Sequence, residues 1–147
     1  MALQITTKGC YGLRAMVDLA RHHADCPILL GSVAQRLGVS RKYLHAMLVA
    51  LKSAGLVRSI RGSGGGYCLT RDPEKITVAE VLAVLEGALT LRDCVRDPEV
   101  CERSRHCVTH QLWTELGGTL ESLLSAITLR DLIEFDDNPQ GRTLIQL

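Results

Sequence analysis

Aromatic residues are scarce in this sequence, and long apolar runs are missing. Phe, Trp and Tyr make up 3% of the 147 residues, whereas apolar residues as a whole make up 46%. The core must therefore consist mostly of Leu, Val, Ala and Ile, which favours helices packed on helices in one domain or in one small domain with an appendage. No apolar run approaches the roughly 18 residues of a membrane-spanning helix, so we expect no membrane partner.

The N-terminal residues lack the features of a secretory signal. The segment MALQITTKGCYGLRAM has neither an apolar h-region nor a cleavage site. We therefore expect a cytoplasmic protein, in whose reducing environment clustered cysteines bind metals or sense oxidants more often than they form structural disulfides. Cys26 and Cys68 are accordingly predicted to be ordinary small residues of the core or of a strand.

Acidic residues are absent between Asp25 and Asp72. Residues 1–71 hold ten Lys and Arg against two Asp and Glu, a net charge of +8, whereas residues 72–147 hold seven against fourteen, a net charge of −7. A positive face attracts phosphate groups even when distant carboxylates neutralise the chain overall. This asymmetry predicts a nucleic-acid partner for the N-terminal half; a merely solvated basic face is the alternative.

The sequence also lacks the residue patterns of an enzyme. It has no paired carboxylates, no pairing of a nucleophile with a base and no substrate loop. The glycine-rich segment RGSGGGY does not change this conclusion, because phosphate-binding glycine loops lead from a strand into a helix, and this one leads back into a predicted strand. We expect no catalytic residues and no small-molecule substrate.

Helical periodicity in the first half of the chain predicts a helix-turn-helix. Thr7 is the expected cap of a first helix, and a Ser32–Gln35 capping box is expected to open a second, shorter one. Gly38 then supplies a turn, and Ser40 caps a third helix. The buried stripe of this third helix is predicted to be Leu44, Leu48 and Leu51.

The segment LVRSIRGSGGGYCLTR predicts two short strands around a glycine-rich tip. In this hairpin, Leu56, Val57 and Ile60 are expected to pair with Tyr67 and Leu69. A helix-turn-helix followed by such a hairpin is a winged helix. The expected fold is therefore mainly α, a winged helix-turn-helix with a two-stranded wing and a long C-terminal dimerisation helix.

The second half of the chain predicts a helix capped by Thr77 and Glu80 and ended by Gly87, and then a long helix over residues 110–135. The apolar residues of the long helix follow a 3-4-3-4 rhythm that suits packing on a second long helix, which the chain does not itself offer. We therefore expect a homodimer. The residues of this seam are Trp113, Leu116, Leu120, Leu123 and Ile127.

These segments predict four regions. Residues 1–87 form the winged-helix DNA-binding domain, 88–107 a cysteine-containing loop, 108–135 the dimerisation helix region and 136–147 a tail without an assigned role.

The expected DNA contacts lie on the third helix and on the wing. In a helix-turn-helix, the N-terminal residues of the second helix of the motif reach base edges in the major groove, and an arginine at a wing tip suits the narrow minor groove. Tyr43 has an alternative role, which is to pack under its helix. The predicted contact residues are Ser40, Arg41, Lys42, Tyr43, Ser59, Arg61 and Gly62, with His45 a further possibility.

The segment CVRDPEVCERSRHCVTH contains Cys94, Cys101, Cys107 and His110. Three thiolates with an imidazole fit an iron–sulfur cluster, and nearby arginines are expected to lower the pKa values of the thiols. The same ligand set fits a structural zinc site, although the C-x2-C knuckles typical of such sites are absent. Metal-free thiols that sense oxidants are the third interpretation.

Three stretches together resemble the IscR-type winged-helix regulators, a family of dimeric bacterial transcription factors of which several carry an iron–sulfur cluster. The resemblance covers about residues 3–135, and RGSGGGY and the three-cysteine loop that leads into THQLW are its most specific parts. The stretches are KGCYGLRAMVDLA, VSRKYLHAMLVALKSAGLVRSIRGSGGGYCL and CVTHQLW with LLSAITLRDLIEF.

The resemblance implies ligands and DNA contacts. The three loop cysteines fall on the cluster cysteines of the iron–sulfur assembly regulators, and His110 falls on the histidine that serves as their fourth ligand. Cys10 falls where a nitric-oxide-sensing branch takes a carboxylate from the partner subunit, so its thiolate is an alternative fourth ligand. The implied cluster is of the 2Fe–2S type, with 4Fe–4S as the alternative. Ser40, Tyr43, Ser59 and Arg61 fall on DNA-contacting positions.

The chain departs from this branch in two further ways. Six residues lie between the first two loop cysteines, where the assembly regulators have five. Lys42 and His45 replace a serine and an acid, so the operator preference is expected to differ. The prediction is a homodimeric repressor or activator whose cluster state changes its binding to a palindromic double-stranded operator. The alternatives are a metal-free thiol-sensing regulator of the same fold and a cluster- or metal-carrying protein that does not bind DNA.

Overall fold

The computed structural model describes residues 4–140 and 143–145, and the described part is mainly helical, as predicted. Part of the tail, to which no role was assigned, lies outside these ranges. Among the described residues, no helix has both the length and the apolar character to cross a membrane. The elements are α1 (Thr7–Arg21), α2 (Leu30–Leu37), α3 (Arg41–Ser53), β1 (Val57–Ile60), β2 (Gly66–Leu69), α4 (Val78–Glu86), α5 (Asp93–Arg96), α6 (Val108–Ala126) and α7 (Leu129–Asp137).

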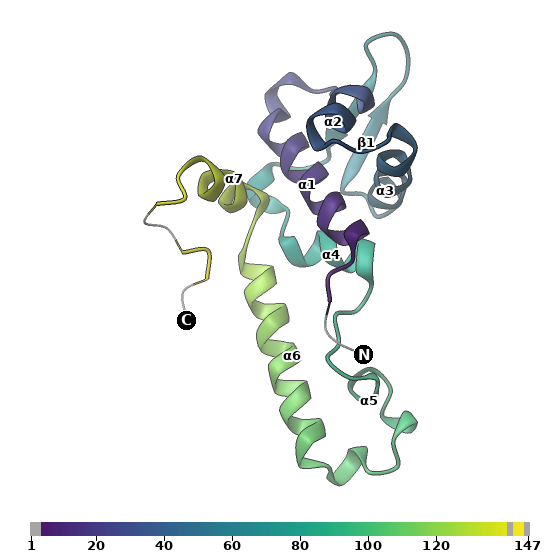
Figure 1. The fold of residues 1–147 in the computed structure, drawn as a ribbon, viewed down its shortest axis with the longest axis vertical. Coiled ribbons are helices and arrows are strands. Elements are labelled where there is room, and N and C mark those ends of the chain that lie inside the picture. Colours follow the sequence, from purple (N-terminus) through teal and green to yellow (C-terminus); the bar gives the residue numbers. More distant parts are fainter. Residues whose placement is uncertain (1–3, 141–142, 146–147) are drawn as a thin grey trace.

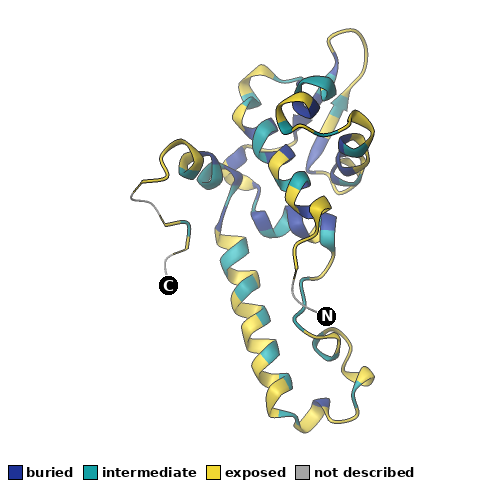
Figure 2. Ribbon diagram, viewed as in Figure 1, coloured by how far each residue is buried: buried dark blue, intermediate teal, exposed yellow. Residues whose placement is uncertain are grey.

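The elements from α1 to α4 form a packed unit, which we call the head, and α7 packs against it. Figure 1 shows the wing at one end of the molecule and α6 extending away from the head toward the opposite end. In Figure 2 the buried residues gather in the head, whereas α6 is exposed or half-buried throughout. The fully buried side chains of the head include Met16, Leu19, Leu44, Met47, Leu48 and Leu51, so the predicted stripe of α3 is confirmed.

Two predicted helix starts are wrong. The N-cap of α1 is Thr6, whose hydroxyl accepts a hydrogen bond from the Gly9 N–H at 3.2 Å, so the cap lies one residue before Thr7. The Ser32–Gln35 capping box does not form, because α2 already begins at Leu30 and the Ser32 N–H donates to the Leu29 carbonyl. Ser32 therefore lies inside the first turn of the helix, where it cannot act as its cap.

The turn of the helix-turn-helix is as predicted. Gly38 has φ 66° and ψ 33°, a left-handed conformation that glycine adopts without strain, and it ends α2. Ser40 then caps α3 by accepting a hydrogen bond from the Tyr43 N–H at 3.1 Å.

The wing is a two-stranded antiparallel hairpin in which Val57 pairs with Leu69 and Ser59 with Tyr67. The predicted strands are thus confirmed, although Ile60 pairs with Gly66 and Leu56 lies just before β1. The segment before α2 also joins β2, since Ile28 and Tyr67 exchange two backbone hydrogen bonds of 2.9 and 2.8 Å.

Two predictions for the second half of the chain have opposite outcomes. The Thr77–Glu80 capping box at the start of α4 is confirmed, and α4 ends at Gly87. The single long helix over residues 110–135 is wrong, because the chain breaks after Ala126 into α6 and α7.

A second capping box causes this break. Thr128 and Asp131 bond each other's backbone N–H groups and thereby begin α7. The backbone around the break also bonds to the start of α4, with Val78 N–H donating to Ile127 and Leu129 N–H donating to Ile76. Ile127 is consequently buried in the head, at 8% exposure, and does not continue the seam of α6.

Cys26 and Cys68 form a disulfide, with their Cα atoms 5.4 Å apart. Cys68 is buried in strand β2, as predicted, but the expectation that the two cysteines are ordinary residues without a bond between them is wrong. The two residues are 42 positions apart in sequence, and the pairing of Ile28 with Tyr67 brings their segments together. The remaining described cysteines are free: Cys10, Cys94, Cys101 and Cys107.

Candidate nucleic-acid interface and cysteine loop

The N-terminus of α3 presents unpaired positive charge. Ser40, Arg41 and Lys42 are all exposed, and the first turn of α3 contains no acidic residue. Within the described ranges, no carboxylate pairs with Arg41, Lys42 or Arg61, whereas Arg36 is engaged by Asp18 at 2.7 Å. The cations that remain available for phosphate are therefore among those that the sequence predicted to contact DNA.

A groove connects the start of α3 with the wing. It encloses about 540 Å³ and is lined on one side by Arg41 and Gln35 and on the other by Ser59 and Ile60. The Ser59 hydroxyl accepts a hydrogen bond from the Lys52 Nζ at 2.6 Å. The fold therefore brings Arg41 and Ser59, 18 positions apart in the numbering, to the two sides of one groove.

Arg61 and Gly62 lie at the exposed tip of the wing, where Gly62 has φ 104°. Tyr43 is placed differently from the other predicted contact residues. It is half-buried against the core, and its ring meets the Tyr11 ring edge-on, with centroids 6.5 Å apart and an interplanar angle of 76°. The ring thus packs under its helix, which was the alternative interpretation of this residue.

His45 links α3 to the wing. Its Nδ1 lies 3.0 Å from the Tyr67 hydroxyl, while the His45 side chain remains on the exposed side of α3. The sequence suggested His45 as a further DNA contact. It did not indicate the contact between His45 and Tyr67, because α3 and β2 meet only in the folded head.

The cysteine loop, residues 88–107, consists of short turns. Cys94 lies in α5, Cys101 follows a 3-10 turn at Pro98–Val100, and Cys107 immediately precedes α6. All three cysteines are half-buried. Ser104 is the anchoring residue of the loop, at 6% exposure, and its hydroxyl donates to the Pro98 carbonyl at 2.8 Å.

The start of α6 favours the thiolate of Cys107. The pKa of Cys107 lies below its ordinary value, chiefly because of the Thr109 hydroxyl, 3.0 Å from the sulfur, and then because of the His110 backbone N–H. Arg103 contributes least. The sequence predicted that arginines would lower thiol pKa values in this loop, and at Cys107 a hydroxyl and the helix N-terminus matter more.

The two candidate fourth ligands lie on different helices. His110 is half-buried in the first turn of α6, and its Nδ1 is buried without a hydrogen-bond partner. Cys10 is exposed on α1. In the part of the chain that the structure describes, no three His, Cys, Asp or Glu side chains converge as a metal-binding group. Cys94, Cys101, Cys107 and His110 thus lie in the cysteine loop and at the start of α6 without forming a closed site, whereas Cys10 lies in the head.

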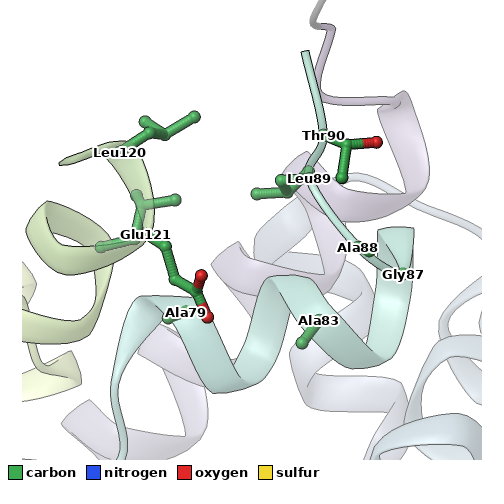
Figure 3. A pocket seen from close by; sticks show the side chains of 9 residues that line it. Ala79, Ala83, Gly87, Ala88, Leu89, Thr90, Leu120 and Glu121 are labelled. Carbon is green, nitrogen blue, oxygen red and sulfur yellow. The ribbon is translucent and has the colours of Figure 1, made fainter. Parts of the chain in front are cut away.

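A small cavity marks the junction of α4, the cysteine loop and α6. It has a volume of about 160 Å³, and Figure 3 shows Ala79 and Ala83 of α4 on one side and Leu120 and Glu121 of α6 on the other. Leu89, three residues after the end of α4, lies across the cavity from Leu120. The small alanine side chains leave space at the point where the loop begins.

The family model for Rrf2, described as an iron-dependent transcriptional regulator, matches residues 5–135. The chain belongs to the Rrf2 family. Among curated relatives of this Rrf2 chain, the HTH-type transcriptional regulator IscR of Xenorhabdus nematophila is 37% identical over 132 residues, which cover 90% of this chain and 80% of the relative. The IscR of Yersinia pestis is 36% identical over 135 residues, covering 92% and 82%.

Solved structures of Rrf2 proteins have the same architecture. T. potens IscR is 37% identical and has a TM-score of 0.76, with 96% of this chain and 93% of the other covered. CymR, the global cysteine regulator of B. subtilis, is also 37% identical with a TM-score of 0.76, covering 90% and 98%. The chain is therefore a winged-helix, DNA-binding transcriptional regulator and not an enzyme.

Proposed function

We propose that this regulator holds an iron–sulfur cluster on its cysteine loop and that the state of the cluster sets its affinity for an operator. The observation that carries the proposal is the donor set of the cysteine loop and the first turn of α6. Cys94, Cys101 and Cys107 are half-buried free thiols, and the buried Nδ1 of His110 has no hydrogen-bond partner. Thiolates with one imidazole are established ligands of iron–sulfur clusters, and the donors therefore fit such a group.

In this proposal, Cys94, Cys101 and Cys107 hold the cluster, and the fourth ligand is His110 or Cys10 of the partner subunit. When bound, the cluster supplies a redox-active centre, of the 2Fe–2S type or alternatively 4Fe–4S. The chain's own residues prepare Cys107 for binding. The Thr109 hydroxyl and the His110 backbone N–H stabilise its thiolate, which is the form that binds metal.

The cysteine loop can change shape at little cost. Its turns are three or four residues long, and most of its side chains are exposed. Few buried contacts resist movement in such a segment. Movement of the loop reaches the junction with α4 and α6, where the cavity beside Leu89 leaves room for it. Cluster binding would therefore reposition α6 relative to the head.

The dimer is proposed to form through α6. None of its 19 residues is buried, and Leu112 and Leu116 are 47% and 45% exposed one turn apart. Contiguous apolar surface of this kind is usually covered by a partner. A second copy of the chain would supply a matching helix and place two heads on a palindromic double-stranded operator.

On DNA, each head would use the N-terminus of α3 and the wing. Arg41 and Lys42 would enter the major groove, Ser40 and Ser59 would bond phosphates, and Arg61 beside Gly62 would enter the minor groove. Tyr43 is proposed to position α3 by packing under it, since its ring contacts Tyr11.

The test is the absorption spectrum of protein purified without oxygen, together with iron, sulfide and zinc assays. We expect a coloured protein containing iron and sulfide in wild type. Colour lost in His110→Ala and retained in Cys10→Ala would identify His110 as the fourth ligand, and the reverse would identify Cys10. Colourless, iron-free protein that cannot be reconstituted would overturn the proposal, and stoichiometric zinc would indicate the structural zinc site.

The second measurement is operator affinity with and without the cluster. The operator is first selected from a pool of random DNA duplexes by the wild-type dimer. We expect affinities that differ on the order of ten- to a hundredfold, the size of typical coupling between two sites. Equal affinities that change only on oxidation of Cys101 and Cys107 would instead favour a metal-free thiol sensor. A protein that selects no duplex would favour a cluster carrier.

A further inference from the structure

We propose that Cys26 and Cys68 are a peroxide-responsive thiol pair inside the DNA-binding head, separate from the cysteine loop. Their disulfide joins the segment before α2 to strand β2 of the wing. The pair requires no iron–sulfur cluster, so it stands or falls independently of the function proposed above.

The fold holds the two residues ready to bond. Their Cα atoms are 5.4 Å apart in the bonded pair, within the normal range of disulfides, so this backbone accommodates the bond. The two hydrogen bonds between Ile28 and Tyr67 hold the segments together without help from the sulfur atoms. The same close approach requires Gly66, where a Cβ would lie 2.2 Å from the Ile28 carbonyl oxygen. The reduced and oxidised heads can therefore share one backbone arrangement.

The surroundings of the two sulfur atoms assign them different roles. Cys68 is 2% exposed, whereas Cys26 is half-buried and thus the more accessible of the two. The Nη2 of Arg58 lies 3.9 Å from the Cys26 sulfur. A guanidinium beside a sulfur stabilises a thiolate, which is the form that attacks oxidants. Cys26 is accordingly the residue that meets the oxidant, and Cys68 is the residue that resolves the product.

The chemistry balances with one hydrogen peroxide for each disulfide. The Cys26 thiolate attacks one peroxide oxygen, the O–O bond breaks, and hydroxide leaves, so that Cys26 becomes a sulfenic acid. The sulfur of Cys68 then attacks the Cys26 sulfur, the S–S bond forms, and the sulfenic oxygen leaves as water. Together the two thiols lose two electrons and two protons, and peroxide is reduced to two waters.

Because of its position, the Cys26–Cys68 disulfide changes how the wing is connected to the rest of the head. The segment of Cys26 leads directly into α2, and β2 carries the far side of the wing, whose tip holds Arg61. Without the disulfide, the two backbone hydrogen bonds between Ile28 and Tyr67 still join these parts, and the disulfide adds a covalent bond between them. Oxidation therefore fixes the wing more firmly to the segment that leads into α2.

The test follows thiol state in the full chain. Wild type and a Cys94→Ser/Cys101→Ser/Cys107→Ser variant are reduced, treated with hydrogen peroxide, blocked with iodoacetamide and mapped by mass spectrometry without reduction. We expect a peptide linked through Cys26 and Cys68 in both proteins. If Cys26 and Cys68 both carry the iodoacetamide label after peroxide, the proposal is wrong. Wild type keeps the test decisive should the variant fail to fold.

Two further measurements separate a reactive pair from a passive one. Arg58→Ala should slow formation of the linked peptide a few-fold, up to about tenfold, while Lys75→Ala, which removes an exposed cation elsewhere, should not change it. The amide hydrogens of Ile28 and Tyr67 should exchange more slowly in oxidised than in reduced protein. Equal rates of formation of the linked peptide in Arg58→Ala and wild type would show that Arg58 does not promote the reaction. Equal amide exchange in the two redox states would show that the disulfide does not fix the wing.

Discussion

At the scale of single residues, Glu80 shows how one carboxylate connects local structure to pH. Burial by itself raises the pKa of Glu80, but hydrogen bonds from the Thr77 N–H at 2.9 Å and from Arg71 at 2.7 Å outweigh it, so that the pKa lies below its ordinary value. The fold therefore favours the ionised carboxylate. The stability that Glu80 contributes is present above its ordinary pKa of 4.5 and is lost as the pH falls through the lower pKa of the folded state.

Replacing Glu80 with Gln tests this linkage. Gln retains an acceptor for the Thr77 N–H but carries no charge for Arg71. We expect Glu80→Gln to lower the free energy of unfolding at neutral pH by less than about 1 kcal/mol, because the side chain is 39% exposed. The difference from wild type should shrink in thermal melts below pH 4.5. A difference that stays constant down to acidic pH would contradict the assignment; Glu74→Gln, at a carboxylate that is 70% exposed, is the control.

At the scale of helices and strands, local signals predicted structure well where they acted within a few residues. Gly38, Ser40 and the Thr77–Glu80 box lie where the sequence placed them, because a cap depends on its own turn. The break after Ala126 was missed, because the apolar rhythm continues through it while the backbone bonds to Ile76 and Val78, some fifty residues earlier, decide it.

The cysteines show the same difference between local signals, which the sequence reveals, and contacts between distant segments, which it does not. Spacing alone singled out the cysteine loop, whereas the bond between Cys26 and Cys68 depends on the pairing of two segments 42 residues apart, which no local pattern encodes. Likewise the exposed positions of Arg41, Lys42 and Arg61 followed from a simple motif, but the packing of Tyr43 on Tyr11 required the folded head.

Helix α6 yields a prediction about assembly. Leu116 lies on the uncovered face of α6 beside Leu112, so a charge there should oppose a helix–helix contact. We expect Leu116→Glu to convert a dimer to a monomer in sedimentation equilibrium at micromolar concentration. Ser125→Glu adds the same charge on the opposite face of α6 and should leave the dimer intact. A Leu116→Glu protein that remains dimeric would place the interface elsewhere.

At the scale of the whole molecule, the two halves of the chain carry opposite charge, and one part of the acidic half lies far from the wing. The unpaired cations lie on α3 and the wing, whereas the cysteine loop and α6 lie at the other end (Figure 1). This arrangement keeps carboxylates away from the surface that is expected to meet phosphate, although the net charge of the chain is only +1.

This separation predicts a salt-dependent interaction in which Arg61 is a distinct contributor. We expect Arg61→Ala to weaken operator binding roughly three- to tenfold and to reduce the slope of log affinity against log salt by about one. Fluorescence anisotropy over a salt series measures both quantities. Lys75→Ala, which removes a cation from outside the proposed interface, should change neither. An unchanged salt slope in Arg61→Ala would show that the wing tip does not contact phosphate.

The close packing of Gly66 against the Ile28 carbonyl also limits how this protein can acquire a new operator preference. A side chain at Gly66 would collide with main-chain atoms that cannot swing aside, and Gly65 is equally confined by the Ile60 carbonyl oxygen, 2.2 Å from where its Cβ would be. In a mutant library selected for folded protein, substitutions are therefore expected to be tolerated at the exposed Arg61 and Ser63 and to be lost at Gly65 and Gly66, where β2 begins.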